Sequence, residues 1–180
     1  MRLTGRTTTP GRRRTAAIGV GAAALALTGS VLAVPADAQE PAVAQAGTYC
    51  GPTEGFYGGG QYTYADVQLC LRADSSGSVS AVVNTGNNSY YWGSAWYSAT
   101  NSYPARWDAK GTAGVGGTGH GYSVNATQTS SSGSAAASLS TTACGTYSVT
   151  MTFHQNGSYW TDAGNDINSG QRTYSINVPC

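Results

Sequence analysis

The chain has 180 residues, which predicts a single domain, and only 9% of them are charged. Five of the nine basic residues lie within the first 14 positions, whereas the part after residue 38 holds four basic and seven acidic residues, a net charge of −3. Without a basic surface, binding to nucleic acid or to anionic membranes is disfavoured.

The N-terminal segment has the three-part pattern of a secretory signal peptide. A basic start is followed by an apolar run from Ala16 to Val34 and by Ala36-Asp37-Ala38, an A-x-A cleavage pattern. Glycine and polar residues interrupt the run, so it is a poor transmembrane span. We expect residues 1–38 to be removed, with Ala44-Gln45-Ala46 as a second candidate site, and the mature protein to be secreted and extracellular, with no membrane span. The Arg12-Arg13-Arg14 cluster leaves both the Sec and the twin-arginine export routes open.

The four cysteines, Cys50, Cys70, Cys144 and Cys180, all follow this segment. An even count in a small exported domain indicates two disulfides. Of the three pairings we favour Cys50–Cys70 and Cys144–Cys180, because each would attach a loosely held end or loop to a strand. Zinc is the alternative, but there is no C-x-x-C pair and no close Cys–His spacing, so we expect neither a metal nor a cofactor.

The remaining elements are expected in the following order along the chain. Residues 39–49 form an Ala-rich extended N-terminal arm, and the stretch Gly51–Gly60 is loop-like. Strands are expected at 61–73, 78–84, 90–99, 105–112, 120–129, 135–144, 146–155 and 173–180, with turns at 74–77, 84–88, 114–119 and 130–133.

Seven or eight short strands, each with one apolar face, predict an all-β domain over residues 50–180. Such strands bury their apolar faces either as two packed sheets or as a single closed sheet. We favour an antiparallel two-sheet β-sandwich, Ig-like or similar, cross-linked by the two disulfides.

Few residues could support catalysis or bind a metal. His120 lies 12 residues after Asp108, but no serine occupies a G-x-S-x-G turn, so a hydrolase triad is disfavoured. His154 falls on the polar face of a strand and is expected to be solvated. Asp162 and Asp166 could bind calcium through oxygen, or could make ordinary turn hydrogen bonds. We therefore predict no catalytic residues and no enzyme activity.

The aromatic residues are the more unusual feature, with twelve tyrosines and four tryptophans but only two phenylalanines. Tyrosine and tryptophan combine apolar faces with a hydrogen-bonding group, which suits binding surfaces. The segments 88–92 and 156–160 resemble each other, and the candidate binding residues in them are Tyr90, Trp92, Tyr159 and Trp160.

The expected aromatic strand at 90–99 would place these rings on two faces. Tyr90, Trp92 and Trp96 would share one face, and Tyr91 and Tyr97 the other. Packing into the core is the alternative use of these rings, and it is favoured for the tryptophans at 92, 96 and 107.

The layout of the whole chain, a signal peptide, a short arm and a Cys-linked β domain, resembles the small adaptor component of the umbrella toxin particles secreted by actinobacteria. In that family a compact β domain extends an N-terminal segment onto a lectin-bearing subunit, and its body contacts a large stalk subunit. The resemblance implies a non-catalytic adaptor in an extracellular antibacterial toxin complex, with other secreted proteins as partners through the arm at 39–49 and the aromatic rim.

Two other functions remain open. A carbohydrate-binding, lectin-like domain would bind glycans through Tyr90, Trp92, Tyr159 and Trp160. A secreted enzyme inhibitor would present a rigid loop, for example Cys50 to Gly60, and a secreted hydrolase would depend on His120.

Overall fold

The computed structural model describes residues 42–180. The expected signal peptide, residues 1–38, and residues 39–41 of the expected arm lie outside the described residues. Within residues 42–180, no helix has the length and apolar character that a membrane crossing needs.

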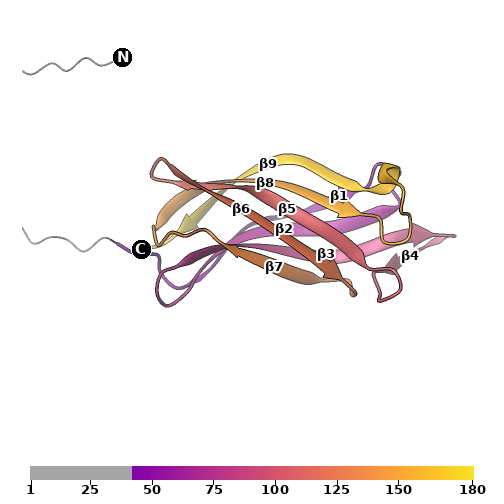
Figure 1. Ribbon diagram of the computed structural model, residues 1–180, viewed down its shortest axis with the longest axis horizontal. Coiled ribbons are helices and arrows are strands. Elements are labelled where there is room, and N and C mark those ends of the chain that lie inside the picture. The colour runs from indigo at the N-terminus through magenta and orange to yellow at the C-terminus, as the bar shows by residue number, and fades with distance from the viewer. Residues whose placement is uncertain (1–41) are drawn as a thin grey trace, which may run out of the picture. The chain divides into compact units, whose positions relative to one another are not determined.

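Nine antiparallel strands form two sheets (Figure 1). The strands are β1 (Gly47–Tyr57), β2 (Thr63–Ala73), β3 (Val79–Trp92), β4 (Ala95–Ser98), β5 (Ala105–Val115), β6 (Thr118–Gln128), β7 (Gly133–Ser138), β8 (Gly145–Asn156) and β9 (Ile167–Val178), and one 3₁₀ turn, η1 (Ala163–Asn165), precedes β9. The first sheet has the order β1-β2-β3-β4, with β7 also paired to β3, and the second has the order β6-β5-β8-β9. The expected all-β two-sheet architecture is confirmed, with nine strands in place of seven or eight.

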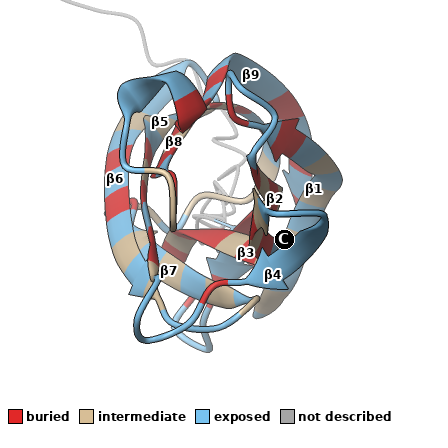
Figure 2. Ribbon diagram, turned by 90° about the vertical axis from the view of Figure 1, so that its right-hand side faces the viewer, coloured by how far each residue is buried: buried red, intermediate tan, exposed pale blue. Residues whose placement is uncertain are grey.

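The core lies between the two sheets, because each strand turns alternate side chains inward. In Figure 2, β1 lies beside β9 and β6 beside β7, so the edges of the two sheets meet. The inward side chains expected from the sequence are buried, among them Val67, Leu69, Leu71, Val79, Ala81, Val83, Tyr147, Val149, Met151, Phe153, Tyr174, Ile176 and Val178.

Both disulfides have the favoured pairing. Cys50 and Cys70 face each other on β1 and β2, with 4.0 Å between their Cα atoms. Cys144 precedes β8 and Cys180 follows β9, so the second bridge attaches the C-terminal residue to the start of β8. The described residues contain no free cysteine.

The loop expected at Gly51–Gly60 is wrong over most of its length, because β1 continues to Tyr57. Pro52 is tolerated there because the pairing of β1 with β2 shifts register between Cys50 and Thr53. The hypothesis of an inhibitor loop from Cys50 to Gly60 therefore loses its structural basis.

The turn expected at 84–88 is also wrong, because β3 passes straight through it. Tyr64 pairs with Ser89 but Asp66 pairs with Gly86, so β3 holds one extra residue at this point. Asn87 has φ +50°. The asparagines and glycine that suggested a turn form a β-bulge instead, since both features use residues that tolerate positive φ.

The single aromatic strand expected after this point is a hairpin, because the chain reverses at Gly93, which has φ +66°. Tyr90 pairs with Tyr97 and Tyr91 pairs with Trp96. Residues that pair across two strands share a face. The expected face assignment is therefore wrong for two rings: Tyr97 lies with Tyr90, and Trp96 lies with Tyr91.

The segment before β1 is bonded to its own domain. Gly47–Tyr49, expected in the arm, belong to β1. The Ala44 N–H donates to the Thr142 carbonyl at 2.9 Å, and the Gln45 N–H donates to the Pro179 carbonyl at 2.8 Å. Only backbone groups make these bonds, so the side-chain pattern of an Ala-rich stretch gives no sign of them.

Candidate binding site

Eleven aromatic side chains gather at one end of the domain, which is formed by the tip of the β3–β4 hairpin and the loop between β8 and β9. Figure 1 shows these two segments at the same end. We call this set the aromatic end; each ring has a neighbour in the set, at centroid distances of 4.7 to 6.5 Å. Its members are Tyr57, Tyr62, Tyr64, Tyr90, Tyr91, Trp92, Trp96, Tyr97, Tyr103, Tyr159 and Trp160. Six of them are 40–58% exposed, namely Tyr57, Tyr62, Trp92, Trp96, Tyr97 and Tyr103.

The loop between β8 and β9, which carries two of these rings, is held by Asp166. The Gly157 N–H donates to Asp166 Oδ1 at 3.1 Å, and the Asn156 side-chain amide donates to Oδ2 at 3.4 Å. His154 Nε2 lies 3.3 Å from the same Oδ2. Because Asp166 is almost fully buried, these contacts fix both ends of the loop relative to β8.

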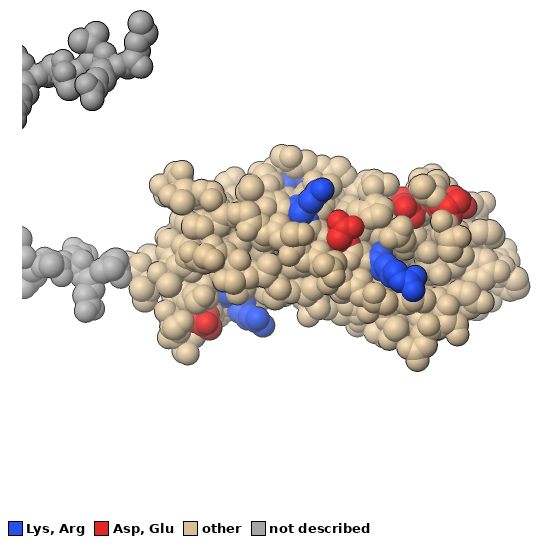
Figure 3. Space-filling model, in the orientation of Figure 1, with Lys and Arg blue, Asp and Glu red and all other residues tan. Residues whose placement is uncertain are grey.

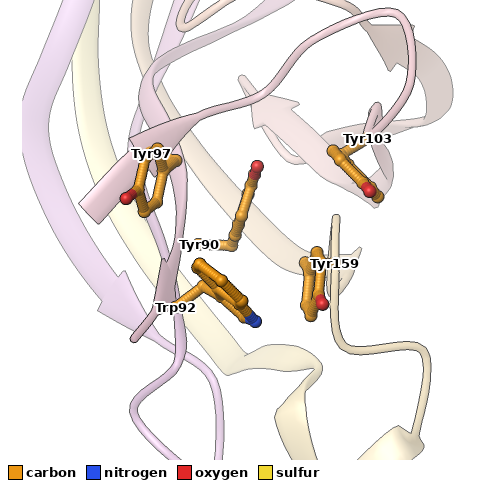
Figure 4. A pocket seen from close by; sticks show the side chains of 5 residues that line it. All are labelled: Tyr90, Trp92, Tyr97, Tyr103 and Tyr159. Atoms are coloured by element: carbon orange, nitrogen blue, oxygen red, sulfur yellow. The ribbon is translucent and has the colours of Figure 1, made fainter. Parts of the chain in front are cut away.

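One side of the hairpin forms a hollow of about 250 Å³, which we call the Tyr90 hollow. Its lining consists of Tyr90, Trp92, Tyr97, Tyr103 and Tyr159 (Figure 4). Tyr90 stacks between Tyr97 and Tyr159, with ring centroids 5.7 and 5.4 Å away. Burial raises the pKa of Tyr90, and the neighbouring tyrosines raise it further.

The structure brings together three of the four residues selected from the sequence. Tyr90, Trp92 and Tyr159 line the Tyr90 hollow, although β3 and the β8–β9 loop are far apart in the sequence. Trp160 is not part of that lining, although its ring lies 5.1 Å from that of Tyr159; its indole N–H donates to the Tyr91 carbonyl at 2.8 Å. Trp160 therefore attaches the loop to β3 and contributes nothing to the lining of the Tyr90 hollow.

Tyr97 and Tyr103 belong to the hollow but were not selected from the sequence. Recognising the turn at Gly93 would have found Tyr97, because a two-residue hairpin turn places residues 90 and 97 opposite each other. Tyr103 lies in the irregular segment after β4, and its ring packs 5.1 Å from Tyr159. No local pattern predicts that contact.

His154 is not simply solvated, as had been expected. Its Nδ1 lies 3.2 Å from Asp108 Oδ1 and its Nε2 lies 3.3 Å from Asp166 Oδ2. Each ring nitrogen of His154 therefore faces a carboxylate, whereas the histidine of a hydrolase triad faces a carboxylate on one side and a serine hydroxyl on the other. Asp108, the acid considered for His120, contacts His154 instead.

The two loop acids considered as calcium ligands bind separate partners. The Asn165 side-chain amide donates to both carboxylate oxygens of Asp162, at 2.9 and 2.8 Å, whereas Asp166 faces Gly157 and His154. Within residues 42–180, no three His, Cys, Asp or Glu side chains gather closely enough to hold a metal ion.

The fold and the site define an all-β domain of two antiparallel sheets, with one disulfide between β1 and β2, another at the ends of β8 and β9, and an aromatic surface at one end. No family model matches the sequence, and no curated protein or solved structure matches the chain.

Proposed function

We propose that the protein is an exported, non-catalytic binding module that holds another secreted protein at the Tyr90 hollow of its aromatic end. The observation that carries this proposal is a group of six aromatic side chains, each 40–58% exposed, on one end of a cross-linked domain; three of them, Trp92, Tyr97 and Tyr103, line the Tyr90 hollow. Soluble proteins seldom expose clustered large apolar side chains unless these bind a partner. Tyrosine and tryptophan are also the residues that contribute most at protein interfaces.

The size and chemistry of the Tyr90 hollow favour a protein partner. Its volume of about 250 Å³ lies below the range of about 300–1,000 Å³ that is usual for small-molecule sites. It is lined only by aromatic side chains, which suits one apolar side chain of a partner better than a ligand with many polar groups. The face drawn in Figure 3 carries few charged side chains, so apolar contact rather than ion pairing would dominate binding.

An adaptor must contact two partners at separate places, and this domain has two well-separated ends. The segment from Ala42 to Ala46 lies beside the Cys144–Cys180 bridge, and β4 lies at the opposite end (Figure 1). This arrangement, with the resemblance in layout to the umbrella toxin adaptor, supports a role as a linking subunit of an extracellular antibacterial toxin complex.

The test is capture of partners from the culture supernatant of the source organism, using the tagged mature chain, followed by binding measurements with each purified partner. Trp92→Ala should weaken binding of one partner about tenfold or more, since it removes an exposed ring from the Tyr90 hollow. Trp96→Ala is the matched control, because Trp96 is similarly exposed but lies on the other face of the hairpin. Equal binding of the wild type and Trp92→Ala would refute the proposal.

The adaptor role needs a second measurement. Deleting residues 39–43 should abolish binding of a different partner and leave the Trp92-dependent one unchanged, because Ala44 and Gln45 keep their backbone bonds to the domain. If the deletion affects no partner, the module binds at one end only and is not an adaptor.

A further inference from the structure

The opposite face of the β3–β4 hairpin carries a second hollow, of about 460 Å³, which we call the Trp96 hollow. The rings of Tyr57, Tyr64 and Trp96 form a triangle, with centroid separations of 4.7, 6.2 and 6.3 Å. Tyr57 is 58% exposed and Trp96 is 44% exposed, so their ring faces are accessible to a ligand. The volume falls within the range of about 300–1,000 Å³ that small-ligand sites occupy.

The Trp96 hollow differs from the Tyr90 hollow in its polar groups. Asn87, Ser89 and Ser98 contribute an amide and two hydroxyls to its lining. Amides and hydroxyls can both donate and accept hydrogen bonds. Asn87 occupies the β-bulge of β3, a feature that redirects side chains and is frequent beside binding sites.

A hydrogen-bonded network holds the side chains of Tyr64 and Asn87 in place. The Tyr64 hydroxyl donates to Asp66 Oδ1, and the Asn87 side-chain amide donates to Asp66 Oδ2 at 2.6 Å. The bond to Asp66 raises the pKa of Tyr64 to about 12, so the hydroxyl remains a donor at any physiological pH. Side chains held before a ligand arrives lose less conformational entropy when it binds.

These groups exclude three classes of ligand. The lining holds no basic side chain that could pair with an anion such as phosphate. The nearby Asp66 already accepts a bond at each carboxylate oxygen, so it is poorly placed to pair with a cation. A wholly apolar ligand would cover Asn87, Ser89 and Ser98 without replacing their hydrogen bonds to water, at a cost of about 1–3 kcal/mol for each group.

A sugar ring satisfies the remaining requirements. Its C–H face can pack on an aromatic ring, whose face is electron-rich, and its hydroxyls both donate and accept hydrogen bonds. We propose that the Trp96 hollow is a binding site for a neutral saccharide, distinct from the Tyr90 hollow, with which it shares only Tyr97 among its lining residues. Trp96 and Tyr57 would stack on the sugar, and Asn87, Ser89 and Ser98 would bind its hydroxyls.

The experiment is affinity electrophoresis and calorimetry of the mature chain with a panel of soluble polysaccharides. Neutral glucans, mannans, galactans and solubilised chitin are compared with the anionic polymers heparin and polygalacturonate. We expect at least one neutral polymer to bind, with an affinity that added salt does not change. Binding to the anionic polymers alone, or to none of the panel, would overturn the proposal.

The variants locate the site. Trp96→Ala should weaken saccharide binding about tenfold or more, and Trp96→Phe should restore part of it, because the phenyl ring keeps a stacking face. Trp92→Ala is the control and should bind the saccharide as the wild type does. Circular dichroism and the denaturation midpoint verify that each variant is folded. If Trp92→Ala abolishes saccharide binding and Trp96→Ala does not, the sugar occupies the Tyr90 hollow and the assignment is wrong.

This proposal and the proposed function fail independently. Loss of the protein partner in Trp92→Ala with no saccharide binding by the wild type would support the adaptor and overturn the saccharide site. Saccharide binding that depends on Trp96, without any protein partner, would support the saccharide site and overturn the adaptor.

Discussion

Removing the Cys144–Cys180 disulfide should destabilise the domain more than removing Cys50–Cys70. The residues of the two bridges are 36 and 20 positions apart in the sequence. Loop-closure entropy in the unfolded chain then gives about 3.8 kcal/mol for the longer loop and about 3.3 kcal/mol for the shorter one. The longer loop also holds Pro179, whose carbonyl accepts the Gln45 N–H, and losing that bond adds about 1 kcal/mol.

The assay is guanidinium unfolding of two alanine double variants, followed by tryptophan fluorescence. We expect the free energy of unfolding to fall by about 4–5 kcal/mol without Cys144–Cys180 and by about 3 kcal/mol without Cys50–Cys70. Replacing both cysteines of a pair avoids a free thiol that could form a wrong disulfide. The reasoning would be refuted if the order were reversed, or if either loss were smaller than about 1 kcal/mol.

Three further predictions concern stability. Gln155 is fully buried and neither of its side-chain polar atoms has a hydrogen-bond partner within residues 42–180, so Gln155→Met should raise the free energy of unfolding by about 1–3 kcal/mol; a lower denaturation midpoint would contradict this. Asp166→Ala should lower the free energy of unfolding by about 2 kcal/mol or more, because it removes a nearly buried carboxylate that accepts several hydrogen bonds. Asp162→Ala should lower it far less, because Asp162 is exposed. Equal effects of the two substitutions would exclude the role given to Asp166. The pKa values of Tyr64 and Tyr174 are raised to about 12, the first mainly by a hydrogen bond to Asp66 and the second mainly by burial, from a value of 10.0 in the unfolded chain. The contribution of these two tyrosines to the free energy of unfolding should therefore be complete below pH 10 and be lost as the pH rises through 12. A denaturation midpoint that stays constant between these pH values would disprove this prediction.

The architecture was predictable because strand patterns and cysteines carry strong constraints. Alternating residues such as Tyr147, Val149 and Met151 indicate one buried face wherever the partner strands lie. The disulfide pairing followed from the preference for attaching ends to strands. Strand alternation can be recognised in a short stretch of chain, and four cysteines allow only three pairings. A single sequence is therefore enough to predict both features.

Two predictions, the turn at 84–88 and the single strand at 90–99, were wrong because asparagine and glycine occur both in β-bulges and in hairpin turns. Asn87 and Gly93 both adopt positive φ, yet the chain continues at the first and reverses at the second. Whether the chain continues or reverses depends on the strand that pairs with it, which is β2 at Asn87 and β4 at Gly93. The local sequence pattern does not show which strand this is. The same limit applies to the binding site: a repeated motif points to Tyr90 and Tyr159, whereas Tyr97 can be found only from the hairpin and Tyr103 only from its contact with Tyr159.

The backbone bonds before β1 bear on how the protein is processed. A signal peptidase that cut after Ala46, the second candidate site, would remove Ala44, which is 3% exposed, together with the bonds that Ala44 and Gln45 make to Thr142 and Pro179. A cut after Ala38 would leave all of these in the mature chain. If the expected signal peptide is removed, the choice of cleavage site would set whether the domain retains its N-terminal contacts, and secretion and folding would be linked through eight residues of sequence.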